Sequence, residues 1–185
     1  NGYVEDEGVT VEREHIKSAR DRDSALQAGR LDGGITDIVA VVFSNEGGID
    51  LKIVSKNDGD IELMAGKGSD IEMMADIKGK SLGLSYNTIM EYTADRMLES
   101  AGISADDVKK VDIPALSNRL EMLQGGKIDA AILPHPLAGL GVKNGARVLA
   151  STSEVIGKAG AIAFTSESLR RNREEIKAVF RAYNR

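Results

Sequence analysis

The sequence predicts an α/β fold of two lobes joined by crossing strands. One stretch occurs twice, at residues 26–37 and again at 123–134, and Arg22 and Arg119 fall in the same register. Short apolar runs alternate with segments of helical periodicity, as in folds built from strand–helix–strand units. No stretch of linker composition separates the two copies, so we expect the chain to cross between the lobes on extended strands.

Each copy of the repeat is expected to end a helix, turn and enter a strand. Gly29 and Gly126 should stop the helices, because a residue without a Cβ adopts the left-handed conformation at little cost. An Asp then leads into a short apolar run, which is typical of a buried strand in a parallel sheet. Ligands of open α/β sheets lie beyond the carboxyl ends of the strands. Two facing lobes therefore predict a cleft with residues 36–37 on one rim and 134–135 on the other.

The other elements of the first half follow from local patterns. Alternating apolar and polar side chains predict a half-exposed strand at residues 9–14. Turn-forming residues at 45–48 and 56–60 predict loops. The remaining expected elements are a helix at 18–28, a strand at 33–36, a helix at 37–44 and strands at 51–55 and 61–65.

The strongest helix pattern of the chain covers residues 88–101. Thr88 and Glu91 have the spacing of a capping box, and Gly102 supplies the stop. Its apolar positions fall on one face. The other elements expected in the second half are strands at 81–85 and 108–113, a helix at 116–123, strands at 146–149 and 161–164, and a closing helix capped by Asn172 with Glu175.

These elements suggest how the chain divides into domains. We expect residues 1–62 plus 165–185 to form lobe 1 and residues 63–164 to form lobe 2. The crossings, which would serve as the hinge, are expected near residues 60–65 and 161–166.

Composition excludes several classes of protein. Hydrophobic residues make up 42% of the 185 residues and charged residues 29%, which is ordinary for a globular protein. The net charge of −5 and the aromatic content of 4% argue against nucleic-acid binding. The absence of cysteine excludes disulfides, a thiol nucleophile and Cys-ligated metals.

No segment predicts insertion into a membrane or export. No apolar run approaches the roughly 20 residues that a membrane-spanning helix needs, and no signal peptide opens the chain. Because the chain opens at Asn1 without Met, the missing leader carries no information about location.

A polar loop is the first candidate for ligand binding. Ser85, Tyr86, Asn87 and Thr88 directly follow a predicted strand and open the strongest helix. Unpaired backbone N–H groups and the positive end of the helix dipole favour an anionic or strongly polar group at such a place. The alternative is an ordinary helix cap, since these residue types are common there.

Two further pairs of residues are candidates at the strand ends. Thr36 and Asp37 are expected either to contact a ligand or to cap the next helix. Pro134 and His135 belong to a loop that its prolines stiffen, which would hold the imidazole at a fixed angle. The alternative for this loop is a rigid surface turn with an exposed His135.

Other signals do not predict catalysis. Arg22 and Arg119 lie inside predicted helices, where we expect them to be solvated or to pair with acids, with contact to a ligand as the alternative. Residues 79–81 resemble the end of a phosphate-binding loop but precede a strand instead of following one. His15 and His135 lack metal-ligand spacing, and no Gly-x-Ser-x-Gly motif occurs. We therefore expect no enzyme, no cofactor and no metal.

Four segments resemble a known family. Residues 25–37, 79–85, 120–131 and 180–184 are similar to the corresponding stretches of substrate-binding proteins of ABC importers. The branch that they resemble is the type II group serving sulfonates, nitrate and thiamine-pyrimidine precursors. The resemblance spans nearly the whole chain and keeps its order.

The resemblance implies a function and a set of contacts. It implies a periplasmic-binding-protein-like type II fold of two α/β lobes, which captures a small polar or anionic solute by hinge closure and delivers it to a membrane permease. The protein would be periplasmic or an extracellular lipoprotein and would bind no nucleic acid. The implied ligand contacts are Ser18 in the loop 15–18, Thr36, Asp37, Ser85, Tyr86, Asn87, Thr88, Pro134 and His135.

The sequence departs from the family in three respects. Members usually begin with a strand and helix ahead of the segment that starts here at Asn1, and they carry further helices after the position of Arg185. Without that strand an unpaired sheet edge would favour a homodimer or strand exchange. His135 stands where relatives more often have an acid, which favours a less cationic ligand.

Two rival functions share the fold. One is an enzyme of the menaquinone-pathway or thiamine-pathway type, although the cysteine-rich signature of the thiamine-pyrimidine synthase has no counterpart here. The other is the effector-binding domain of a LysR-type regulator. Function lies in sites placed on shared folds, so residues ahead of Asn1 would discriminate between them.

Overall fold

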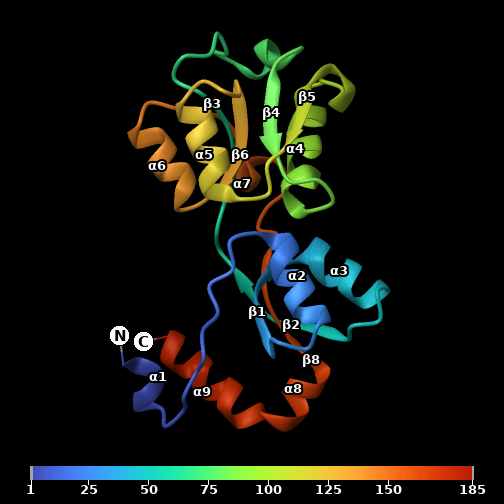
Figure 1. Cartoon of the computed structure of the whole chain (residues 1–185), viewed down its shortest axis with the longest axis vertical. Helices are drawn as coiled ribbons and strands as arrows, with labels where there is room; N and C mark the ends of the chain where they lie inside the picture. The colour runs from blue at the N-terminus through green and yellow to red at the C-terminus, as the bar shows by residue number, and fades with distance from the viewer. Residues whose placement is uncertain (1, 185) are drawn as a thin grey trace.

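The computed structural model describes residues 2–184 and contains two lobes stacked along its long axis (Figure 1). Lobe 1 is built on a three-stranded sheet of order β1-β8-β2, and lobe 2 on a five-stranded sheet of order β5-β4-β6-β3-β7. The strands of lobe 1 are β1 (Gly33–Asp37), β2 (Leu51–Asn57) and β8 (Gly160–Thr165). The strands of lobe 2 are β3 (Ile61–Ala65), β4 (Ser81–Leu84), β5 (Lys109–Asp112), β6 (Ala130–Pro134) and β7 (Arg147–Ser151).

Helices surround both sheets. Lobe 1 carries α1 (Tyr3–Asp6), α2 (Ala19–Gln27), α3 (Ile38–Glu46), α8 (Ser166–Arg171) and α9 (Arg173–Tyr183). Lobe 2 carries α4 (Ile89–Ser100), α5 (Leu116–Gln124), α6 (Leu137–Lys143), α7 (Thr152–Val155) and the 3-10 turns η1 (Met74–Ile77) and η2 (Ala105–Asp107). In Figure 1, α2 and α3 lie on the side of lobe 1 that faces lobe 2, whereas α1 and α9 lie at the opposite end. No helix within residues 2–184 is long and apolar enough to cross a membrane.

The predicted repeat is confirmed as the same turn used once in each lobe. Gly29 follows α2 with φ 68° and Gly126 follows α5 with φ 65°, both in the left-handed region. The backbone carbonyl of Asp32 then accepts the amide of Thr165 at 2.9 Å, and that of Asp129 accepts the amide of Gly66 at 2.8 Å. Each Asp therefore ties the start of its own strand to the end of an antiparallel neighbour.

Only one copy of the repeat lies in a parallel pair. Strand β6 runs parallel to β4, as predicted, and antiparallel to β3. The prediction was wrong for β1, whose recorded partner is β8, running antiparallel to it. An apolar run reports burial but not the direction of the neighbouring strand, so the two cases look alike in sequence.

The strand predicted at residues 9–14 was also wrong. The segment is irregular and mostly exposed, and within residues 10–17 no backbone hydrogen bond ties it to another part of the described chain. An alternating pattern forms a strand only where a neighbour supplies the ladder hydrogen bonds.

The chain crosses between the lobes twice, at residues 58–60 and at 156–159. Lys158 joins the crossings, because its Nζ donates to the Asp58 carbonyl at 2.7 Å and to Asp60 Oδ1 at 3.0 Å. Strand β8 shares a sheet with β1 and β2, whereas the predicted boundaries assign residues 63–164 to lobe 2. We therefore propose that the lobe boundaries fall within these two crossings.

Apolar burial is unequal between the lobes. Two clusters pack on opposite faces of the five-stranded sheet, with residues such as Leu63 and Met64 fully buried. The buried cluster of lobe 1 consists of Leu26, Val41, Leu51 and Ala163. Since apolar burial is the main stabilising contribution in folding, we expect lobe 2 to contribute most of the stability of the chain.

Replacing Gly126 by Ala should destabilise the protein. A Cβ at this position meets no atom within 4 Å, so the cost comes from the positive φ alone. We expect the free energy of unfolding in urea to fall by about 1 kcal/mol. Gly68→Ala, at an equally open position without positive φ, is the matched control and should stay within about 0.5 kcal/mol of wild type. Equal effects of the two substitutions would contradict the conformational explanation.

Candidate functional site

A buried arginine of lobe 2 links the residues just beyond the carboxyl ends of β4 and β5 to the middle of β6, close to the rim that these carboxyl ends form. Arg119 is fully buried, and its Nε and Nη2 donate to the Ile113 carbonyl beyond β5 at 3.0 and 2.7 Å. Its Nη1 donates to the Ile132 carbonyl of β6 at 2.7 Å, and Nη2 also donates to Ser85 Oγ beyond β4 at 2.8 Å. The arrowhead of β4 points towards lobe 1 in Figure 1, so this rim faces the junction of the lobes.

The expectation that Arg119 is solvated or pairs with an acid was therefore wrong. Carbonyl and hydroxyl oxygens satisfy its donors, which lets a cation be buried without a salt bridge. Burial lowers the pKa of Arg119 to about 10, although the negative charge of Asp112 acts to raise it. The side chain therefore stays protonated at neutral pH. Arg22, its counterpart in the repeat, does pair with acids: its Nε lies 2.8 Å from Asp23 and its Nη2 3.4 Å from Asp37.

Carboxylates of β5 and α4 bond to the backbone of the predicted polar loop. The amide of Tyr86 donates to Asp112 Oδ1 at 3.1 Å, and the amide of Asn87 donates to Glu91 Oε2 at 2.8 Å. The predicted capping box requires Glu91 to accept the amide of Thr88. The carboxylate of Glu91 instead accepts the amide of the preceding residue, Asn87. Two backbone donors that we expected to receive a ligand are already bonded.

Two residues of the loop fix its conformation. Thr88 Oγ1 accepts the amide of Met90 at 3.2 Å and donates to the Ser85 carbonyl at 2.8 Å, so Thr88 caps α4. Asn87 has φ 58°, a left-handed conformation that Asn tolerates better than most residues. The side chain of Asn87 is exposed at the mouth of the loop, whereas Ser85 is buried against Arg119.

Two of the three lobe 1 candidates cap helices. Ser18 Oγ accepts the amide of Asp21 at 3.1 Å at the start of α2, and Asp37 Oδ1 accepts the amide of Ala40 at 2.8 Å at the start of α3. Thr36 is buried, and its Oγ1 has no hydrogen-bond partner among residues 2–184. Ligand contact by these three residues stays a prediction.

Pro134 and His135 lie beside the first crossing. The amide of His135 donates to the Asp60 carbonyl at 3.0 Å, and its Nε2 lies 3.0 Å from Glu62 Oε1. Nearly half of the His135 side chain is exposed. The loop is thus anchored to the hinge, and its contact with a ligand stays a prediction.

A polar hollow of about 250 Å³ lies between helix α2 of lobe 1 and the loop before α4 of lobe 2. Its lining residues are Arg20, Asp23, Ser24, Gln27, Tyr86, Asn87 and Thr88. An ion pair spans the same junction, because Arg20 Nη2 lies 3.2 Å from Asp112 Oδ2. The structure therefore brings three predicted residues to one cavity wall and places a stripe of α2 opposite them.

Sequence reasoning missed the α2 side of this hollow. Arg20, Asp23, Ser24 and Gln27 are spaced three or four residues apart, so they form one polar helix face. That spacing can be recognised in the sequence, but a polar helix face usually points to solvent. It becomes a cavity wall only because lobe 2 lies opposite. The predicted residues Ser18, Thr36, Asp37, Ser85, Pro134 and His135 do not line this hollow.

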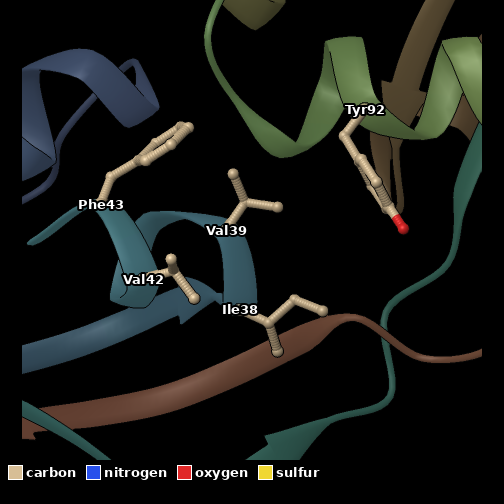
Figure 2. Close-up of a pocket in the computed structure, with 5 residues that line it drawn as sticks. All are labelled: Ile38, Val39, Val42, Phe43 and Tyr92. Atoms are coloured by element: carbon tan, nitrogen blue, oxygen red, sulfur yellow. The ribbon is translucent and has the colours of Figure 1, made fainter. Parts of the chain in front are cut away.

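A second hollow, of about 240 Å³, is apolar and lies between α3 and α4. Figure 2 shows Ile38, Val39, Val42 and Phe43 along α3, with Tyr92 extending from α4 towards them. The junction of the lobes thus offers a polar and an apolar recess, with α4 or the loop before it forming the wall on the lobe 2 side.

Replacing Arg119 by Met should destabilise lobe 2. The substitution leaves the Ile113 and Ile132 carbonyls and the Ser85 hydroxyl buried without their donor. We expect a loss of about 3 kcal/mol in urea-induced unfolding. Arg171→Met, which removes an exposed ion pair with Glu167, should cost about 1 kcal/mol or less. A loss for Arg119→Met no larger than for Arg171→Met would contradict the bracing role.

The unfolding free energy of Asp37→Asn relative to wild type should increase as pH rises. Burial raises the pKa of Asp37 above its ordinary value, although the Ala40 amide and Arg22 oppose this. The folded state therefore binds the proton more tightly, and wild-type stability falls as pH rises from the ordinary pKa through the raised one. Asn keeps a capping oxygen and carries no charge, so its unfolding free energy relative to wild type should increase between about pH 3 and about pH 7. The exposed control Asp106→Asn should show no such trend, and a pH-independent difference for Asp37→Asn would contradict the assignment.

The comparisons with known proteins agree on one fold. The periplasmic aliphatic sulphonate binding protein SsuA from Escherichia coli is 21% identical, with a TM-score of 0.71 over 91% of this chain and 59% of its own. The alkanesulfonate-binding protein SsuA from Xanthomonas axonopodis pv. citri, bound to MOPS, is 21% identical, with a TM-score of 0.76 over 91% and 60%. The ligand-binding component of an ABC-type import system from Staphylococcus aureus is 17% identical, with a TM-score of 0.78 over 98% and 66%.

The chain spans about 60% of the length of these sulfonate-binding proteins. A comparison with curated proteins gives no match. A family model described as "NMT1/THI5 like" matches residues 1–185. The chain therefore belongs to the NMT1/THI5-like family and has the type II periplasmic-binding-protein fold.

Proposed function

We propose that this chain is the solute-binding receptor of an ABC importer. The observation that carries the proposal is the polar hollow, whose walls come from α2 in one lobe and from the loop 86–88 in the other. A solute held there touches both lobes at once. Membership of the NMT1/THI5-like family and the fold shared with sulfonate-binding proteins support the same conclusion.

The proposed mechanism is closure about the two crossings. A solute stabilises the closed form only through contacts that the open form lacks, and a hollow shared by two lobes provides such contacts. The ion pair between Arg20 and Asp112 adds a direct link across the same junction. Exposed ion pairs contribute about 0.2–1 kcal/mol, so this link biases closure without locking it.

Delivery and location complete the proposal. The Escherichia coli relative is described as periplasmic and the Staphylococcus aureus relative as part of an ABC-type import system. We propose by analogy that this chain works outside the cytoplasmic membrane, either in the periplasm or as an extracellular lipoprotein, and passes its solute to a membrane permease. The homodimer predicted from an unpaired edge would form at β1, which ends the order β1-β8-β2.

Filling the polar hollow should abolish binding without unfolding the protein. Ser24 lines the hollow from α2, so Ser24→Phe places a ring where the solute is proposed to sit. A thermal-shift panel of methanesulfonate, nitrate, 4-aminopyrimidine and succinate identifies wild-type ligands, because saturating ligand adds a few kcal/mol of stability. For any hit, we expect Ser24→Phe to weaken affinity by at least about tenfold.

Ser100→Phe is the matched control. Ser24 and Ser100 both lie exposed on helices and donate to the preceding turn, but Ser100 lies at the other end of α4 from the loop 86–88. The control should bind as wild type does. Equal affinity of Ser24→Phe and wild type would remove the hollow from the proposal, and a wild-type protein that binds no member of a broader solute panel would overturn the receptor function.

A further inference from the structure

We propose that the polar hollow selects an uncharged solute with both hydrogen-bond donors and acceptors, such as a carboxamide, and disfavours sulfonates and other oxyanions. This inference rests on the proposed function and names the class of solute for the same site. It separates this chain from the sulfonate-binding proteins that share its fold.

The charged groups of the hollow are already paired. Arg20 Nη2 lies 3.2 Å from Asp112 Oδ2, and Arg22 Nε lies 2.8 Å from Asp23 Oδ1. Arg20 and Asp23 are the charged residues of the lining, and each has an opposite charge as its partner. No unpaired cation among the lining residues is therefore available to an oxyanion.

The backbone donors of the loop are occupied in the same way. The Tyr86 amide donates to Asp112 and the Asn87 amide to Glu91. Lys110 in turn holds Glu91, with its Nζ 3.2 Å from Glu91 Oε1. A helix start that would ordinarily attract an anion thus has carboxylates of the protein itself beside it.

Two carboxamides are the unengaged polar side chains of the lining. Gln27 of α2 and Asn87 of the loop both line the hollow, and neither side chain has a hydrogen-bond partner among residues 2–184. The hydroxyl of Ser24 donates to the Arg20 carbonyl, and that of Thr88 caps α4. Each carboxamide offers donors and an acceptor, which match a neutral solute with the same groups.

Repulsion by nearby carboxylates, or the cost of breaking their ion pairs, then decides between the two classes of solute. An oxyanion entering the hollow must lie near Asp23, Asp112 and Glu91, or must displace one of them from its partner. Displacement leaves a partly buried charge uncompensated, which is costly. A neutral solute pairs with Gln27 and Asn87 and leaves every ion pair intact.

The test compares two probes of similar shape and different charge. Nicotinamide carries a carboxamide on a pyridine ring, and pyridine-3-sulfonate carries a sulfonate at the same place. We expect isothermal titration of the wild-type chain to give at least about tenfold tighter binding of nicotinamide, since repulsion by one nearby carboxylate is of that order. Sulfonate binding as tight as or tighter than nicotinamide binding would overturn the inference, and so would binding of neither probe.

A variant should reverse the preference. Asp112→Asn keeps an oxygen for the Tyr86 amide and frees the Arg20 guanidinium in the hollow. We expect the ratio of sulfonate affinity to nicotinamide affinity to rise by about tenfold. Glu91→Gln, which keeps an acceptor for the Asn87 amide, is the second variant in case the first unfolds, and it should raise the same ratio.

Asp50→Asn is the matched control, because it also removes one carboxylate but from an exposed pair with Lys52 on lobe 1. This control should leave the ratio unchanged. A rise equal to that of Asp112→Asn would mean that net charge alone sets the preference, which overturns the inference. The receptor function would survive each of these failures, since it fails only when no solute of a broader panel binds.

Discussion

A buried guanidinium that touches no carboxylate among residues 2–184 organises the rim of lobe 2 that faces lobe 1. Arg119 donates to the Ile132 carbonyl in the middle of β6, to a carbonyl beyond β5 and to a hydroxyl beyond β4, so these three strands are linked at one place. The loop 86–88 starts from that place and carries the lobe 2 wall of the polar hollow. Burial of such a cation is tolerated because nearly all its donors are satisfied, and the hollow depends on that satisfaction.

The junction of the lobes combines firm local structure with weak links. Each wall is fixed within its own lobe by helix caps, such as Ser18 for α2 and Thr88 for α4. Across the junction, the recorded ion pair is between Arg20 and Asp112, whose side chains are both partly exposed. Preformed walls joined by weak links suit a protein that opens and closes at little energetic cost.

Helix stops and helix caps could be predicted from the sequence, whereas the neighbours of strands and of side chains could not. The stops at Gly29 and Gly126 and the cap at Thr88 depend on neighbouring residues, and the structure confirms them. Asn172 was expected to cap the last helix, but its side chain makes no such bond. Tyr183 comes two helical turns after the buried Ile176, so the helical period places both on one face, but Tyr183 is mostly exposed because a periodic pattern does not say how far the covering layer extends.

The two lobes are connected by a pair of crossings, and Lys158 joins these by hydrogen bonds. Two separate ribbons could twist independently, and the lobes would then slide as well as swing. Lys158 belongs to the second crossing and donates to two groups of the first, so we expect the crossings to bend together and the lobes to rotate about a single axis. The loop at His135 is anchored to the first crossing through Asp60, so the carboxyl end of β6 moves together with that crossing.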